Sequence, residues 1–211
     1  MAFFPVHFRA YPVWFKTAKK RRAQETIGLS ISATKLSICH VRGSRDLRWA
    51  ASFSLAPTDD WKAVLDHCVR DHSLRGVPCH VVLNATDYKL LPAEKPDVPA
   101  AEVDQALLWS LRDVLDAPPT EMTVQSFPFA QGLERPGRQM RHAVAARRSR
   151  IQELVDGVIA AELWLQSIDI PELALCKLTS RLPENDVGVC VVSQGARDVS
   201  IALYRNGELY L

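Results

Sequence analysis

The sequence predicts an α/β fold in which two β-meanders bracket an α+β insert. Short runs of β-branched and aromatic residues, separated by turn residues, occur near both ends of the chain. Between them, apolar residues recur at helical spacing in two places and alternate with further strand-like runs. With 211 residues, 47% of them hydrophobic, the chain is long enough for one domain with an inserted subdomain.

The composition excludes several classes of protein. A net charge of +2 gives no general indication of nucleic-acid binding. The five cysteines include no CxxC pair and are typical of buried thiols in a reducing cytosol. No run approaches the roughly 20 apolar residues of a membrane span, and the first residues lack the order of a signal peptide. We therefore expect a cytoplasmic chain whose membrane contact is peripheral or made through a partner.

Residues 1–25 form a tail in which aromatic residues precede a basic cluster. One interpretation is a membrane-surface anchor, with aromatics at the headgroup boundary and cations on anionic lipid. The other is a tail that docks on the domain or has no role. Pro5 and Pro12 interrupt any long amphipathic helix and favour the second interpretation. The residues concerned are Phe3, Phe4, Phe8, Tyr11, Trp14, Phe15, Lys16, Lys19, Lys20, Arg21 and Arg22.

Residues 26–87 are predicted to begin with a meander of three strands, over 27–31, 35–41 and 49–55. An amphipathic helix follows, because apolar residues recur at i, i+3, i+4, i+7 and i+8, with Asp59 or Asp60 as its cap. These residues are Trp61, Val64, Leu65, Cys68 and Val69. A buried strand over 79–83 closes this part.

Residues 88–170 show the order β-α-β-β-α-β. Strands are predicted over 88–91, 122–129, 139–146 and 165–170, one helix opens at Pro99, and Ser149 caps the other. The apolar stripes are Val103, Leu107, Leu111, Val114 and Leu115, then Ile151, Leu154, Val155, Val158, Ile159 and Leu163. This is the order of the ferredoxin-like split βαβ unit, so we predict a compact inserted subdomain.

Residues 171–211 are predicted as a linking helix and three strands. Pro171 begins the helix, which runs through Leu182, and strands follow over 187–193, 199–205 and 208–211. Asn206-Gly207 forms a two-residue hairpin turn between the last two strands. If the chain is complete, the free edges of these strands should pair within a homodimer or with a separately supplied domain.

Four segments resemble the MshI family of MSHA pilus biogenesis proteins, relatives of PilM of type IV pili and of the cytoplasmic part of GspL of type II secretion. They are Leu91-Pro92 through Asp97-Val98-Pro99, Ala106-Leu107-Leu108-Trp109, Val144-Ala145-Ala146-Arg147-Arg148-Ser149 and Ile168-Asp169-Ile170-Pro171-Glu172-Leu173-Ala174-Leu175. The resemblance covers residues 26–211. It implies an actin-like (RNase H-like) domain with the insert in the position found in PilM and FtsA, truncated before its second domain is complete.

The resemblance also implies a role. Members of this family receive the cytoplasmic tail of an inner-membrane partner, a PilN-like protein, and couple it to the assembly machinery, which includes an assembly ATPase. The chain would then act at the inner face of the inner membrane, with a peptide groove between the first subdomain and the insert. Tyr88, Leu90 and Trp109 are candidates to line that groove.

Actin-like ATPases bind phosphates with two β-hairpins and hold Mg²⁺ with an aspartate from each. The segments that resemble these hairpins are 27–35 and 191–196. Ser30 and Ser193 stand where the acids would be, and a serine hydroxyl has no charge to hold Mg²⁺. The degenerate nucleotide site would comprise Gly28, Ser30, Ser32, Lys35, Ser193 and Gly195.

We therefore expect no ATP hydrolysis and no bound cofactor. Two alternative functions stay open: an ATP-binding assembly factor of the same machinery, or an inert truncated product. It also stays open whether Gly28, Lys35 and Gly195 serve only as strand and turn residues, which is compatible with a scaffold.

The other clusters of reactive side chains have simpler explanations. His67 and His72 are five apart on a helix, about 140° around its axis, and Cys79 and His80 face opposite sides of a strand, so we expect no metal site. No triad signature is present, and we expect no catalytic residue. The acids Asp97, Glu102 and Asp104 suit a helix N-terminus, whereas Asp113 and Asp116 suit solvated surface.

A run of arginines has two interpretations, which stay open. Arg138, Arg141, Arg147, Arg148 and Arg150 form either a basic face of the insert for an acidic partner or lipid, or ordinary solvated charge. In the second case Arg147 and Arg148 are available to Glu153 or Asp169.

Overall fold

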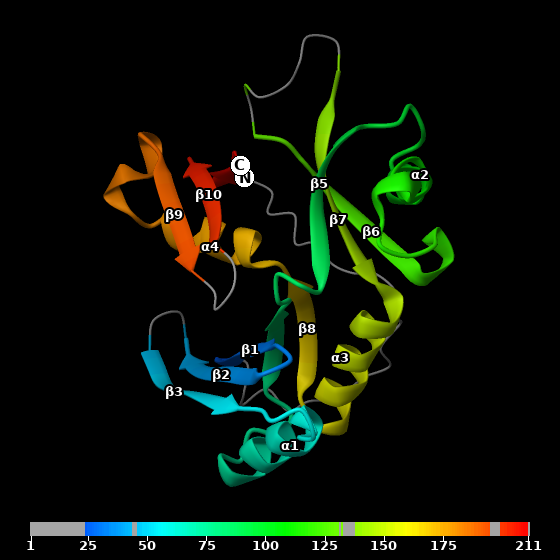
Figure 1. The fold of residues 1–211 in the computed structure, drawn as a ribbon. Helices are drawn as coiled ribbons and strands as arrows, with labels where there is room; N and C mark the ends of the chain where they lie inside the picture. Colours follow the sequence, from blue (N-terminus) through cyan, green and yellow to red (C-terminus); the bar gives the residue numbers. More distant parts are fainter. Residues whose placement is uncertain (1–23, 44–45, 131, 133–137, 195–198, 211) are drawn as a thin grey trace. The chain divides into compact units, whose positions relative to one another are not determined.

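The computed structural model describes residues 24–43, 46–130, 132, 138–194 and 199–210, which form two compact units (Figure 1). The first unit holds the described residues up to Tyr88 together with Ala146–Asp169. The second holds Lys89–Ala145 and the residues from Ile170 onward. The predicted tail over 1–25 lies outside the described residues, apart from its last two positions.

The first unit is built on a five-stranded sheet in the order β3-β2-β1-β4-β8. The first three strands are antiparallel, as predicted, and β1, β4 and β8 run parallel to one another. Its elements are β1 (Glu25–Ile31), β2 (Lys35–Arg42), β3 (Asp46–Ser54), α1 (Trp61–Asp71), β4 (Pro78–Val82), α3 (Arg148–Ala160) and β8 (Trp164–Asp169).

One face of this sheet is apolar and buried. Ile27, Leu29 and Ile31 alternate along β1 and are at most 2% exposed. The predicted helix α1 is confirmed: it begins after Asp60, whose carboxylate accepts a hydrogen bond from the Lys62 amide at 2.9 Å. Its apolar stripe is buried, with Val64 only partly so.

Helices α1 and α3 approach each other closely at a glycine. A Cβ atom on Gly157 would lie 2.1 Å from the ring of Trp61, so only glycine fits there. The Trp61 indole Nε1 donates a hydrogen bond to Glu153 Oε1 at 2.8 Å, which fixes the ring against α3.

The insert of the second unit is a three-stranded sheet with one helix. Strands β5 (Tyr88–Glu94), β6 (Met122–Pro128) and β7 (Met140–Arg147) lie in the order β5-β7-β6. Helix α2 (Val103–Ser110) packs its buried Val103, Leu107 and Leu108 on one face of that sheet. Two short 3₁₀ helices, Arg112–Val114 and Pro119–Glu121, lead from α2 to β6.

The last part of the second unit is a helix and a three-stranded meander. Helix α4 (Pro171–Thr179) and the 3₁₀ helix Pro183–Asp186 precede β9 (Val189–Gln194), β10 (Val199–Arg205) and β11 (Glu208–Leu209), ordered β11-β10-β9. The φ angles of Asn206 and Gly207 are 52° and 72°, which confirms the predicted hairpin turn.

The predicted order β-α-β-β-α-β is present, but the boundary 88–170 of the insert is wrong. Strand β8 pairs in parallel with β4, with Asp169 opposite Val82, and α3 packs against α1 and β8. Both elements therefore belong to the first unit. The insert is limited to Lys89–Ala145 and contains only the first four elements, β-α-β-β, of a ferredoxin-like unit.

Four helix boundaries also differ from the prediction. Helix α2 begins at Val103 instead of at Pro99. Helix α2 ends at Ser110, because the chain tightens into a 3₁₀ turn and leaves Val114 49% exposed. Helix α3 begins at Arg148, so Ser149 lies in its first turn instead of capping it. Helix α4 ends at Thr179, short of the predicted Leu182.

Candidate functional site

The first candidate site is the turn between β1 and β2. The Ser32 amide donates to the Lys35 carbonyl at 2.8 Å, and the Ser32 hydroxyl donates to the same carbonyl at 3.2 Å. The Thr34 amide in turn donates to Ser32 Oγ at 3.4 Å. Because these donors bond within the turn, it offers a phosphate fewer amide groups than an open glycine turn does.

Gly28 has a packing role in the sheet. It lies in the middle of β1 opposite Cys39, and a Cβ atom there would be 2.8 Å from Cys39 Sγ. The missing side chain makes room for the thiol of the neighbouring strand. This contact explains a glycine at position 28 without any nucleotide.

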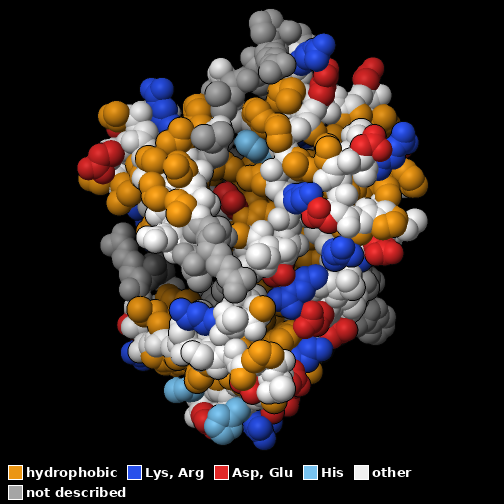
Figure 2. Space-filling model, viewed as in Figure 1, with side chains coloured by type: hydrophobic (Ala, Val, Ile, Leu, Met, Phe, Trp, Pro, Cys, Tyr) orange, Lys and Arg blue, Asp and Glu red, His pale blue; other side chains and the backbone are white. Residues whose placement is uncertain are grey.

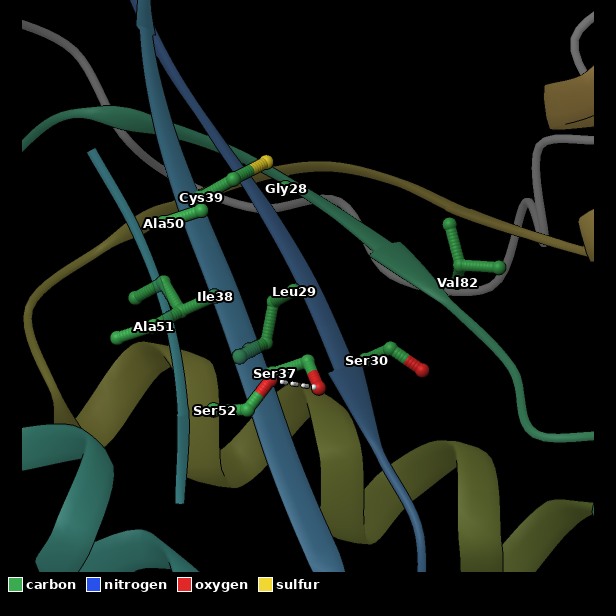
Figure 3. A pocket seen from close by; sticks show the side chains of 10 residues that line it. All are labelled: Gly28, Leu29, Ser30, Ser37, Ile38, Cys39, Ala50, Ala51, Ser52 and Val82. Carbon is green, nitrogen blue, oxygen red and sulfur yellow. Dashed lines mark hydrogen bonds between the residues drawn. The ribbon is translucent and has the colours of Figure 1, made fainter. Parts of the chain in front are cut away.

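Ser30 lies in an open hollow of about 420 Å³ on the face of the sheet opposite the buried one (Figure 3). The lining is mostly apolar, with Ser30, Ser37 and Ser52 as its hydroxyl groups, and it contains no charged residue. Figure 3 shows the Ser37 and Ser52 hydroxyls pointing toward one another, at 3.0 Å. The hollow therefore has no group that would neutralise a phosphate or hold Mg²⁺.

Asp169 is the acid in the sheet that lies closest in register to this hairpin, and it was not predicted to be a site residue. Asp169 ends β8 and lies in register with Val82, which is in register with Ser30. The Ser167 hydroxyl donates to Asp169 Oδ2 at 2.6 Å, so His80 Nδ1, 2.8 Å from Ser167 Oγ, is the donor of the second bond. Ligands of open α/β sheets bind at the carboxyl ends of parallel strands. The position of Asp169, at the end of a predicted strand and just before a helix, was the sequence signal that could have identified it as a candidate site residue.

Arg150 connects three parts of the first unit near the same strand ends. Its guanidinium donates to Asp87 Oδ1 at 3.2 Å, to Glu153 Oε2 at 2.8 Å and to the Ile31 carbonyl at 3.2 Å. Burial raises the pKa of the Glu153 carboxyl, but hydrogen bonds from Trp61 and Arg150 and the Arg150 charge outweigh it, so the net shift is downward. Arg150 thus fixes the end of β1.

Of the two interpretations of the arginine run, a basic face formed by the insert is wrong, because three of the five arginines lie outside the insert. Arg147, Arg148 and Arg150 lie at the start of α3 in the first unit. Within the insert, Arg138 pairs with Glu94 at 3.3 Å, and Arg141 donates to Ser126. The arginines are therefore divided between the units, and Arg138, Arg141 and Arg150 bond to the protein groups named above.

The second hairpin, between β9 and β10, is described only at its ends. Ser193 is exposed and lies opposite Ser200 in the ladder. Gly195 falls in 195–198, outside the described residues. The first hairpin belongs to the first unit, whereas Ser193 belongs to the second.

Comparison with solved structures identifies the architecture. A PilM–PilN type IV pilus biogenesis complex matches with a TM-score of 0.70 and 22% identity over 89% of this chain and 60% of that one. The cytoplasmic domain of EpsL, from the type II secretion system of Vibrio cholerae, matches with 0.60 and 14% over 88% of this chain and 69% of that one. A Bacteroides thetaiotaomicron protein of actin-like ATPase fold and unknown function matches with 0.52 and 12% over 90% and 69%. The chain has the actin-like fold.

The predicted fold class is thus confirmed, and this actin-like chain spans 60% of the length of the PilM–PilN chain it matches. Neither a scan of protein-family models nor a search of curated proteins gives a match.

In this actin-like chain, the three predicted groove residues do not share one surface. Lys89 bonds to the Val114 carbonyl beyond α2, and Ala93 packs in the α2 core, so the alternate Leu90 lies on the opposite face of β5. Trp109 is 52% exposed on α2. Tyr88 is half-buried at the start of β5.

The insert face opposite α2 contains an unforeseen aromatic stack. The His142 ring lies between Phe127 and Phe129, with ring centroids 4.9 and 4.1 Å away. Burial lowers the pKa of His142 to about 4, against an opposing hydrogen bond to the backbone of Leu209. A lone histidine in a strand gave no sequence signal for this stack.

The histidines predicted not to share a metal have other contacts. His67 Nε2 lies 3.0 Å from Asp71 Oδ2, and the ring of His72 stacks on Trp49 at 4.3 Å. Across the described parts of the chain, no cluster of three or more histidine, cysteine or acidic residues is arranged to hold a metal ion. In the same parts, no helix has the length and apolar character needed to cross a membrane.

Proposed function

We propose that this chain is a cytoplasmic actin-like scaffold of a type IV pilus or type II secretion machine, and that it works without ATP hydrolysis. Support comes from two neighbours of the same fold, one in a PilM–PilN type IV pilus biogenesis complex and one an inner-membrane component of a type II secretion system. The finer assignment to an MSHA-type pilus depends on the sequence segments that resemble the MshI family.

The observation that carries the absence of hydrolysis is the closed turn between β1 and β2. Its amide and hydroxyl donors bond to the Lys35 carbonyl, and Ser30 supplies no carboxylate for Mg²⁺. Phosphoryl transfer depends on positioned cations, so a hairpin without an acid lacks the central component of that chemistry.

The proposed partner is the cytoplasmic tail of a PilN-like inner-membrane protein. The named neighbour is a complex with PilN, and a short tail of this kind would bind as an added strand or in an apolar groove. An assembly ATPase is a further proposed partner. Through these contacts the chain would be held at the inner face of the inner membrane.

A second candidate function is an ATP-binding assembly factor of the same machinery. Asp169 favours it, because this carboxylate lies at the carboxyl ends of the parallel strands, in the register of Ser30. Against it, Asp169 already accepts a short hydrogen bond from Ser167, at 2.6 Å. We therefore rank the scaffold first.

Thermal unfolding of the full chain separates the two candidates, because a ligand that binds only the folded state raises the melting temperature. One arm adds Mg·ATP, and the other adds a synthetic peptide of the cytoplasmic tail of a PilN-like protein from the same organism. We expect no shift with Mg·ATP and a saturable rise with the peptide. A saturable rise with Mg·ATP contradicts the scaffold, and the absence of a peptide shift contradicts the proposed partner.

A further inference from the structure

A tryptophan side chain is exposed on the insert at the end of α2. Trp109 is 52% exposed, and Val114, in the 3₁₀ turn that follows, is 49% exposed. The buried stripe of α2 faces the insert sheet and leaves these two side chains open to solvent. Figure 2 shows hydrophobic and acidic side chains exposed together where Figure 1 draws α2. Tryptophan is enriched among the residues that carry binding energy at protein interfaces, so this end of α2 is a candidate interaction surface.

This surface lies on the side of the insert sheet that faces away from the meander of the same unit. Ala143 of β7 packs in the core beneath α2, so the adjacent His142 points to the opposite face of the sheet. The His142 ring hydrogen-bonds to the backbone of Leu209 in β11. The meander therefore contacts the face opposite α2, and Trp109 and β11 lie on opposite sides of the insert sheet.

The surroundings of Trp109 are acidic. Residues 96–121, which include α2, contain six acidic residues and one basic residue, a formal charge of −5. Glu102 lies two helical turns before Trp109, and its side chain makes no capping hydrogen bond. Asp113 lies one turn after Trp109, and its ion pair with Arg112, at 3.6 Å, is weak because the two side chains are 86% and 64% exposed. Both carboxylates are therefore open to a cation from a ligand.

We propose that the surface formed by Glu102, Trp109 and Asp113, the Trp109 surface, binds the tail of this chain, residues 1–22. The tail contains six basic residues, six aromatic residues and no acidic residue. Its cations can pair with the two carboxylates, and its cations or rings can stack on the Trp109 indole. The 23 residues that precede the described part can extend over about 80 Å, several times the radius of gyration of about 13 Å for a domain of 100 residues, so they are long enough to reach the insert.

The charge of the Trp109 surface favours the tail over other occupants. A second copy of the same surface would bring acidic residues together, and anionic lipid would be repelled. A basic and aromatic segment is complementary, and residues 1–24 are the longest stretch of the sequence without an acidic residue. Of the two interpretations of the tail, docking on the domain is thus the one for which the structure offers a matching surface. This inference is independent of the proposed function, because it concerns neither the nucleotide hairpin nor the PilN-like partner.

The test is limited digestion of the full chain with trypsin, with loss of the tail followed by intact mass. Trypsin cleaves after the lysines and arginines of the tail, and a docked tail is cleaved only while it is released. A synthetic peptide of residues 1–22 gives the rate for a free tail, and we expect the wild-type tail to be cleaved at least about fivefold more slowly. Trp109→Ala should bring the rate close to that of the peptide. Trp164→Ala is the matched control and should not, because Trp164 is 41% exposed but lies in the first unit.

A wild-type tail that is cleaved as fast as the peptide overturns the inference, and protection only after the addition of phosphatidylglycerol vesicles assigns the tail to a membrane surface instead. Equal rates for the two tryptophan variants also overturn it, since the tail then docks elsewhere or not at all. Protection that increases with protein concentration contradicts docking within one chain. If circular dichroism shows that Trp109→Ala does not fold, Glu102→Lys tests the same surface by reversing a charge, and it should speed cleavage of the tail by at least about threefold.

Discussion

Replacing Arg150 with alanine removes one guanidinium from three partners in the first unit. The Arg150 and Asp87 side chains are only 19% and 15% exposed, so the substitution leaves a mostly buried carboxylate without its cation. Breaking a buried ion pair costs about 3–5 kcal/mol. Residual solvent at this site screens part of that cost, so we expect the free energy of unfolding to fall by about 2–3 kcal/mol.

The assay is equilibrium unfolding in urea, followed by far-UV circular dichroism. Arg70→Ala is the matched control, because Arg70 also makes an ion pair, with Asp66 at 3.0 Å, but the two side chains are 55% and 43% exposed. An exposed pair of this kind contributes less than about 1 kcal/mol. If Arg150→Ala costs no more than Arg70→Ala, Arg150 does not fix the end of β1 as described.

Two further predictions concern the cores of the two units. Burial lowers the pKa of His142 from 6.5 to about 4, so as pH falls between these values the unfolded chain binds a proton that the folded chain excludes. Stability measured by urea unfolding should therefore decline over this window in the wild type, and less so in His142→Phe; equal declines would contradict the buried stack. Gly157→Ala should destabilise the first unit by roughly 1–2 kcal/mol, because overpacking against Trp61 outweighs the helix propensity of alanine. In a thermal melt, Ala160→Gly at an exposed position of the same helix is the control, and a Gly157→Ala melting point at or above the wild type would refute the close contact.

The sequence predicted local structure well because local structure depends on local pattern. Alternating apolar residues located the strands, and Asp60 and Asn206-Gly207 located a helix start and a hairpin turn. Pairing between strands is different, since a strand such as β8 has the same pattern whichever sheet it joins. Its parallel pairing with β4 assigns α3 and β8 to the first unit.

In the candidate site, too, local features could be predicted from the sequence, whereas contacts between distant residues could not. The sequence alone suggested that Ser30 and Ser193 stand where actin-like ATPases have acids, and this correspondence stays a prediction. The distant contacts came only from the structure: Arg150 reaches the Ile31 carbonyl 119 positions away, and the space above Gly28 is taken by Cys39 of the next strand. Asp169 was within reach of sequence reasoning, because it ends a predicted strand just before a helix.

The measurement that tests the central claim most directly is a calorimetric titration of Mg·ATP into the full chain, repeated with Lys35→Ala. An actin-like hairpin closed by Ser32 and lacking an acid at Ser30 should give no saturable heat with either protein. Saturable binding that weakens in Lys35→Ala would contradict the account, since it would show that the hairpin still binds the phosphates.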